Sequence, residues 1–208
     1  MPNREQLIRD HRAALINCSK CPSMIGPVVS GSPVLSPILL IGQAPGDKEG
    51  GFGKPFAWTA GKTMFKWFER IGLDEKRVRQ RVYMAAVCRC FPGKNPKGGD
   101  RVPNPAEIER CAVWLQAEVD LLKPALILPV GKLAISQLMP VNKLNDVIGI
   151  LHPVNFHGHN TEAIPLPHPS GASTWHRTES GLALLDSALT LLQHHPAWQQ
   201  ICADSKVI

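Results

Sequence analysis

The sequence predicts an α/β fold in which three layers, αβα, surround a central, mainly parallel sheet of four strands. Short apolar runs of strand length recur along the chain, as expected for strands buried on both faces. Segments with helical spacing of apolar residues separate these runs, and such alternation is typical of a parallel sheet covered on both faces. The four predicted strands are residues 38–41, 82–87, 125–130 and 163–166.

Capping residues and apolar stripes predict the helices. The clearest start is Asn104, because Pro105 follows at the first helical position and Glu107 completes a capping box. The predicted helices are residues 3–17, 60–72, 105–122, 132–139 and 178–194. Residues 93–104 and 140–161 are predicted to be loops.

The chain length suits one domain. It has 208 residues, of which 44% are hydrophobic, enough to build a core. We expect a single domain over residues 1–208. Residues 1–30 would form the N-terminal helix and the first cysteine pair, and residues 195–208 a C-terminal tail.

The net charge bears on the kind of partner, and the N-terminal sequence bears on the cellular compartment. A net charge of +6 is compatible with a nucleic-acid partner, but does not establish one. No apolar run approaches the length of about 18 residues typical of a membrane helix, and the N-terminus lacks a secretory signal pattern. We expect a cytoplasmic monomer with no membrane partner, in which cysteines serve metal binding or core packing before disulfides.

Two loops follow predicted strands and carry reactive groups. One is Gly42-Gln-Ala-Pro-Gly46, followed by Asp47 and Glu49, and the other is His168-Pro-Ser-Gly171. In open α/β sheets, ligands bind outside the carboxyl ends of the strands. The two loops are therefore expected to meet and hold a planar polar ligand, with a carboxylate placed to steer a water molecule.

These loops, together with Gly53-Lys-Pro-Phe56 and Ala60-Gly61, resemble the signatures of the iron–sulfur, family 4 type of the uracil-DNA glycosylase superfamily. The resemblance extends from Cys18 to about Arg177. It implies a monofunctional DNA glycosylase that flips uracil out of DNA and excises it in base excision repair, leaving an abasic site.

The resemblance also implies roles for individual residues. Phe56 would stack on the extruded base, and His168 would donate a hydrogen bond to the O2 atom of the base as negative charge develops there. Glu49 is favoured as the group that orients the attacking water, with Asp47 supporting it. The residues expected to hold the base are Gly42, Gln43, Ala44, Phe56 and Ala86.

The segment after His168 is implied to enter the minor groove of DNA. Its expected DNA-binding residues are Ser170, Gly171, Ala172, Ser173, Trp175 and Arg177. Ala172 is too small to fill the space of a flipped nucleotide, so Trp175 or Arg177 is the expected wedge. Six other basic residues are candidate phosphate contacts: Lys54, Lys62, Arg89, Lys94, Lys97 and Arg101.

Six cysteines include a chelating pair, Cys18-x-x-Cys21. The resemblance implies that Cys90 and Cys111 complete the ligands of a structural [4Fe–4S] cluster. Cys88 could replace Cys90, because the two would lie on the same face of an extended strand, and Cys202 is expected to be free. Four thiolates would also suit zinc, and Cys111 alone could be a core residue.

The sequence departs from the family pattern at two positions. Ala86 stands where the family has an asparagine that reads uracil, and Gln43 replaces a glutamate. Hypoxanthine or xanthine are therefore further candidate substrates. These departures also leave open a catalytically weak or inactive DNA-binding module of the same fold, and a zinc-stabilised flavodoxin-like protein with a small ligand is a third reading. No lysine lies beside the His168 loop, so no Schiff-base lyase step is expected.

Overall fold

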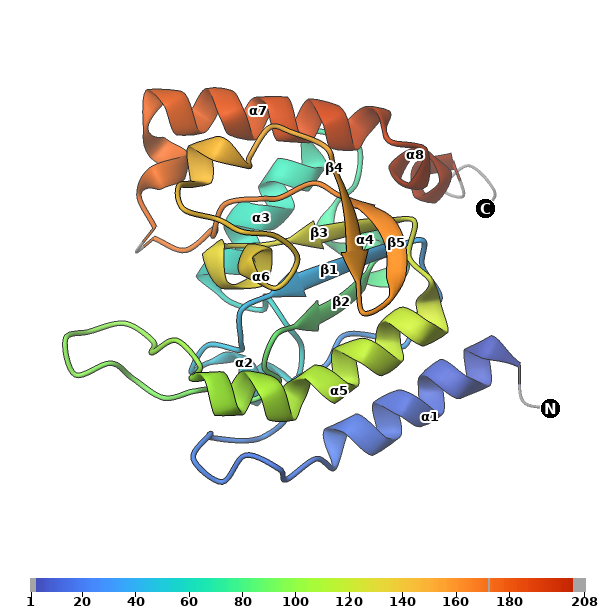
Figure 1. The fold of residues 1–208 in the computed structure, drawn as a ribbon, viewed down its shortest axis with the longest axis vertical. Helices are drawn as coiled ribbons and strands as arrows, with labels where there is room; N and C mark the ends of the chain where they lie inside the picture. The colour runs from blue at the N-terminus through green and yellow to red at the C-terminus, as the bar shows by residue number, and fades with distance from the viewer. Residues whose placement is uncertain (1–2, 172, 204–208) are drawn as a thin grey trace.

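A computed structural model describes residues 3–171 and 173–203 of the chain. Its centre is a five-stranded sheet with the strand order β2-β1-β3-β5-β4 (Figure 1). All neighbours pair in parallel except β4 and β5, which are antiparallel. The strands are β1 Ile38–Gly42, β2 Tyr83–Ala86, β3 Leu126–Pro129, β4 His152–Phe156 and β5 His159–Ala163.

The predicted fold class is confirmed, whereas the predicted number of four strands is wrong. The additional strand, β4, lies within the predicted loop 140–161 and forms a hairpin with β5. This hairpin turns at His157 and Gly158, both of which have positive φ angles. Along β4, partly buried and exposed residues alternate up to the buried Phe156. An edge strand of this kind carries polar residues and lacks the apolar run by which a central strand is recognised.

Eight α-helices surround the sheet in the described part of the chain. They are α1 Arg4–Ile16, α2 Glu49–Phe52, α3 Thr59–Glu69, α4 Glu75–Arg81, α5 Pro105–Leu122, α6 Lys132–Ser136, α7 Glu179–His194 and α8 Pro196–Ala203. The predicted capping box of Asn104 and Glu107 is present at the start of α5. None of these helices is both long enough and apolar enough to cross a membrane.

The predicted C-terminal tail is only partly a tail, because it begins with α8. Trp198 of this helix is 1% exposed, and its Nε1 donates a hydrogen bond to the carbonyl oxygen of Ile71 at 3.1 Å. Together with the buried Ala197 and Ile201, this large aromatic side chain docks the short helix on the domain. Residues 204–208 lie outside the described residues.

Alternation along the central strands separates two apolar cores. Ile38 and Leu40 of β1 pack into the core beneath α3, α7 and α8, whereas Leu39 and Ile41 pack into the core beneath α1 and α5. The sheet is therefore buried on both faces, and α5 and α7 lie on opposite sides of it (Figure 1). The carboxyl ends of β1, β2 and β3 remain open for a site between the layers.

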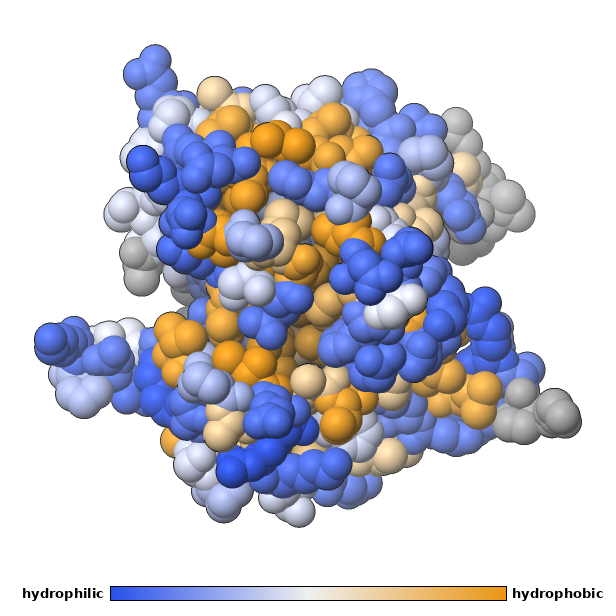
Figure 2. Space-filling model, in the orientation of Figure 1, coloured by the Kyte–Doolittle hydropathy of each residue, from blue (hydrophilic) through white to orange (hydrophobic). Residues whose placement is uncertain are grey.

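Residues 91–103 project from this body next to the start of α5 (Figure 1), and the projection has a largely hydrophilic surface (Figure 2). Its base is held by a pair of backbone hydrogen bonds between Ile25 and Phe91. Further along, Lys94 and Asp100 pair across the projection as an antiparallel bridge. The predicted loop 93–104 is thus a folded projection attached at its base.

Candidate functional site

A cavity of about 600 Å³ opens at the carboxyl ends of β1 and β2. The first loop lines it from Gly42 to Glu49, and the second loop contributes His168 and Ser170. Phe56 and Ala86 also line this cavity. The two loops that the sequence predicts to converge therefore do so, and Phe56 and His168 face one shared space.

The hydrogen bonds of His168 determine which ring nitrogen carries the proton. Its Nδ1 lies 3.3 Å from the backbone nitrogen of Ser170 and 2.9 Å from the Ser170 hydroxyl. A backbone N–H can only donate, so Nδ1 is the acceptor and the neutral ring has its proton on Nε2. Burial, and then the neighbouring His176, lower the pKa of His168. The lowered pKa favours the neutral ring, and in that form the N–H donor of the site is Nε2.

Phe56 has a strained backbone that the surrounding residues stabilise. Its φ angle is 52°, in the left-handed region that aromatic residues rarely adopt. A Cβ atom on Gly42 would lie 2.8 Å from the Phe56 ring, and one on Gly61 would lie 1.7 Å from the Phe56 carbonyl oxygen. The two glycines of the sequence motifs are therefore required for the aromatic ring to reach the cavity.

Arg79 holds this turn, and sequence reasoning missed it. Its two terminal nitrogens donate to the carbonyl oxygens of Pro55 and Phe56 at 2.8 and 3.0 Å. Its guanidinium also lies over the Phe65 ring, 4.7 Å from the ring centroid. Arg79 belongs to a helix rich in charged residues, Glu75–Arg81, a composition typical of a solvent-exposed surface, so no sequence signal distinguished it.

The two candidate acids have different surroundings. Glu49 is 9% exposed, and its two oxygens accept hydrogen bonds from the backbone nitrogens of Gly46 and Ala57 at 3.2 and 3.1 Å. Burial raises the pKa of Glu49, and the backbone hydrogen bonds oppose that shift. Asp47 is more exposed and pairs with Lys94 of the projection at 3.1 Å. Glu49 therefore ties the first loop to the Phe56 turn, whereas Asp47 lines the cavity as an exposed residue.

The two departures from the family pattern lie close together on the cavity wall. Ala86 is 8% exposed and pairs with Gly42 across the parallel strands β2 and β1. The backbone carbonyl of Gln43 accepts a hydrogen bond from the backbone nitrogen of Cys88 at 3.1 Å. The first loop is thus joined by backbone pairing to the chain that follows β2.

The predicted DNA-binding segment lies partly along the cavity rim. Ser170 and Ser173 line the cavity, and Gly171 and Arg177 are exposed. Trp175 is half-buried, and its Nε1 donates to the Asn145 side chain at 2.8 Å. Ala172 lies outside the described residues.

One candidate phosphate contact is wrong. The Arg89 side chain is 2% exposed and pairs with the buried Glu118, so it cannot reach DNA. It occupies the interior because it follows a strand that is buried on both faces, which the basic character of the residue alone does not reveal.

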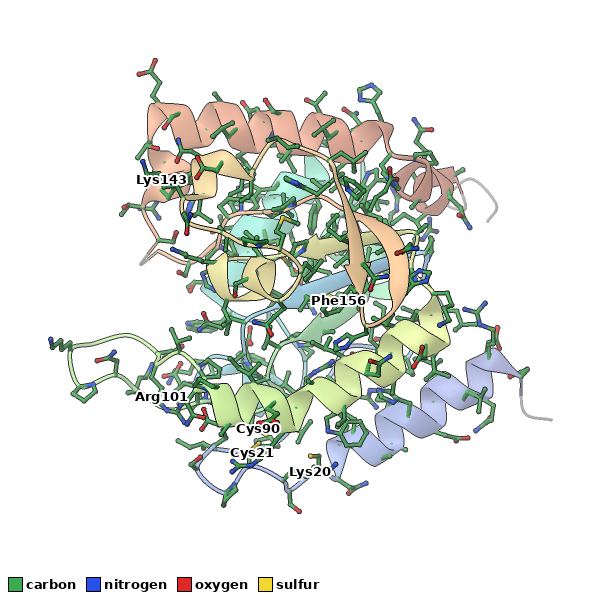
Figure 3. All side chains as sticks on the ribbon, viewed as in Figure 1. Lys20, Cys21, Cys90, Arg101, Lys143 and Phe156 are labelled. Carbon is green, nitrogen blue, oxygen red and sulfur yellow. The ribbon has the colours of Figure 1, made fainter. Side chains whose placement is uncertain are left out.

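A second cavity, of about 390 Å³, contains the four predicted cysteine ligands. Figure 3 shows Cys21 and Cys90 close together beneath the start of α5. Cys88 is fully buried outside this lining, where its thiol donates a hydrogen bond that lowers the pKa of Cys111. Cys202 is distant, on α8. The four cysteines that line the cavity are Cys18, Cys21, Cys90 and Cys111.

The donor set of this cavity is four thiols, the ligand type of sulfur-ligated metal groups. In residues 3–171 and 173–203, no group of three or more His, Cys, Asp or Glu side chains lies close enough together to hold a metal ion. A [4Fe–4S] cluster takes one thiolate per iron, so its ligands surround a larger volume. The cavity is also lined by Arg89 and Trp114, and Nε and Nη1 of Arg89 and Nε1 of Trp114 are buried with no acceptor among the described residues. Such donors fit a large, negatively charged, sulfur-rich group.

Comparison with known proteins agrees with the motifs. The model of the uracil DNA glycosylase superfamily matches residues 29–193. A type-4 uracil-DNA glycosylase of Pyrobaculum aerophilum is 29% identical over 162 residues, which cover 74% of this chain and 78% of that one. The type-4 enzyme of Thermotoga maritima is 27% identical over 173 residues, covering 82% and 85% of the two chains. The predicted resemblance is confirmed, and the chain belongs to the uracil DNA glycosylase superfamily.

Proposed function

We propose that this DNA N-glycosylase is monofunctional, accepts a uracil flipped out of DNA and hydrolyses its glycosidic bond, leaving an abasic site. The observation that carries the proposal is the cavity that Phe56 and His168 share. It brings an aromatic face and an N–H donor together at the carboxyl ends of the strands. Flipping costs a few kcal/mol, and stacking on one aromatic ring returns about 1–3 kcal/mol. The fixed turn at Phe56 means that this ring is placed before the base arrives.

His168 serves as the electrophilic donor in this reaction. As the bond between C1′ and N1 breaks, its electron pair moves onto the base, and negative charge accumulates at O2. The Nε2–H of a neutral, half-buried imidazole stabilises that charge without prior reorganisation. A water oxygen then bonds to C1′ and gives up one proton, and the departing base anion takes up one proton, so the products are the neutral free base and an abasic sugar.

Asp47 is the stronger candidate for steering the water. Both oxygens of Glu49 already accept backbone hydrogen bonds, whereas the single ion-pair partner of Asp47 among the described residues is the exposed Lys94. Glu49 therefore has a positioning role in this proposal. The family resemblance of the sequence favoured Glu49 as the water-steering acid, so this proposal exchanges the roles of the two acids.

Cys18, Cys21, Cys90 and Cys111 would hold the [4Fe–4S] cluster. When bound, the cluster supplies no chemistry to base excision, which needs no electron transfer. The cysteines join the segment after α1, the end of β2 and the start of α5, so their common ligand would fix three parts of the chain. The exposed Arg177 is favoured over the anchored Trp175 as the wedge in DNA.

Ala86 favours a broader set of bases. A methyl group on the cavity wall leaves space and offers no hydrogen bond to the edge of uracil, so a larger deaminated base such as hypoxanthine or xanthine is a second candidate substrate. The base is then held by stacking and by backbone groups of the first loop.

The first test is the change His168→Ala. Removal of the donor should lower single-turnover excision of uracil by about 10²–10³-fold, as removal of an oxyanion donor does. Cleavage of the abasic product by alkali in a labelled oligonucleotide measures the rate. His194→Ala, on the exposed face of α7, is the matched control and should leave the rate unchanged. If cluster-loaded wild type excises neither uracil nor hypoxanthine nor xanthine, so that alkali cleaves none of the three oligonucleotides, the protein is a DNA-binding module instead.

The two acids are separated by Asp47→Asn and Glu49→Gln. Loss of the water-steering charge in Asp47→Asn should lower the excision rate by about tenfold or more while the melting temperature stays within about 1 °C of wild type. Glu49→Gln should lower the melting temperature, because an amide cannot accept both backbone hydrogen bonds as well as a carboxylate does. Glu49 would instead be the steering acid if Asp47→Asn kept the wild-type excision rate while Glu49→Gln lost most of its excision rate at an unchanged melting temperature.

The third prediction concerns the charge of His168. Because burial and His176 lower its pKa, the ring should titrate below the ordinary histidine value of 6.5 and stay neutral at and above that pH. The chemical shift of the His168 Cε1 proton, assigned by comparison with His168→Ala, measures the midpoint by NMR. A midpoint at or above 6.5 would contradict the expected lowering, and only a midpoint above about 7 would make the donor mainly an imidazolium at neutral pH.

The fourth prediction concerns base preference. Ala86→Asn should raise the ratio of uracil to hypoxanthine excision by about tenfold, because a side-chain amide adds hydrogen bonds to one edge only. Competition between the two labelled substrates in one reaction measures the ratio. An unchanged ratio at an unchanged melting temperature would mean that residue 86 does not contact the bound base.

A further inference from the structure

The interior around the cysteine cavity contains an arginine with unsatisfied donors. Arg89 lies between Cys88 and Cys90 and is 2% exposed. Its Nη2 pairs with Glu118, but Nε and Nη1 have no hydrogen-bond partner in the described part of the chain. A guanidinium has five N–H groups, and those on Nε and Nη1 account for three of them. Buried donors of a charged group rarely remain without an acceptor.

Glu118 balances the charge of Arg89 but cannot satisfy these donors. The carboxylate is fully buried, and it also accepts a hydrogen bond from the Tyr83 hydroxyl at 2.8 Å and lies 3.3 Å from His11 Nε2. Its oxygens are therefore occupied by three partners, one from α1, one from β2 and one from the chain after β2. The remaining N–H groups of Arg89 belong to a residue that lines the cysteine cavity.

Trp114 adds a second unsatisfied donor to the same cavity. It lies three residues after Cys111 on α5, so the two side chains project from neighbouring positions on the helix. Its Nε1 is buried and has no acceptor within residues 3–171 and 173–203. The ring is fixed by an edge contact with His11, at 5.5 Å between centroids. The orientation of this donor is therefore set by packing.

We infer that Arg89 and Trp114 donate N–H···S hydrogen bonds to the sulfur atoms of the cluster and so stabilise it and set its reduction potential. This inference rests on the proposed cluster. A [4Fe–4S] group with four thiolates is negatively charged, and it offers inorganic and cysteine sulfurs as acceptors where both residues face the cavity. Hydrogen bonds to these sulfurs are one of the factors that set the potential. Because the reduced cluster carries more negative charge, both donors favour the reduced state.

The most conservative test is Trp114→Phe, which removes one N–H and keeps an aromatic ring. The protein should bind iron and sulfide in the wild-type ratio. Its midpoint potential should shift to a more negative value, and the half-life of its visible absorbance under a chemical oxidant should fall by about fivefold, as for loss of one hydrogen bond. The control Trp198→Phe removes an indole N–H that bonds Ile71 in the opposite core, and it should change neither quantity.

Arg89 is tested without leaving a buried carboxylate unpaired. The double change Arg89→Met with Glu118→Gln removes both charges and should shift the potential further in the same direction than Trp114→Phe does. Wild-type protein that binds no iron and sulfide would disprove the proposed cluster. If the wild-type protein binds iron and sulfide, but both variants keep its midpoint potential and half-life, the proposed cluster is supported and the inference about Arg89 and Trp114 is overturned. A shift in one variant alone would overturn it for the other residue.

Discussion

The left-handed backbone of Phe56 is the constraint on which the proposed active site depends. An aromatic residue does not adopt φ = 52° without compensation, and here the compensation comes from three directions. Gly42 and Gly61 leave the space, Arg79 bonds the carbonyl oxygens, and Glu49 bonds the following backbone nitrogen at Ala57. As a result, the aromatic ring of Phe56 already lines the cavity that it shares with His168. Several residues that look catalytic or merely charged in the sequence therefore support one turn.

Much of the architecture was predictable because it depends on local patterns. The central strands are apolar on both faces, and α5 has its capping box in the sequence, so both could be identified without a structure. The convergence of the two loops followed from the parallel sheet, since strand ends of one direction meet at one edge. The family motifs then named Phe56 and His168.

The remaining features depend on tertiary contacts that no local pattern encodes. Strand β4 is half-exposed at the sheet edge, and α8 is held mainly by Trp198, so neither carries a strong periodic signal. Arg79 resembles its charged neighbours until its two bonds to the Phe56 turn are seen. Arg89 has the sequence character of a DNA contact, yet it lies inside because the chain after β2 remains buried.

The two cavities are mechanically connected through the chain that follows β2. Ala86 lines the base cavity, the backbone of Cys88 bonds Gln43 of the first loop, and Cys90 lines the cysteine cavity. This continuity means that a shift at the cysteines would move one wall of the base cavity.

A second connection runs through the projection 91–103. At its base, Phe91 pairs with Ile25, close to the Cys18–Cys21 segment, and Arg101 bonds Glu107 at the start of α5 through both terminal nitrogens. Further along, Lys94 reaches Asp47. A cluster that fixes the cysteine segment would therefore also fix the base of the projection that pairs with the proposed water-steering acid. A cluster with no part in the chemistry of excision would in this way stabilise the geometry that the proposed reaction needs.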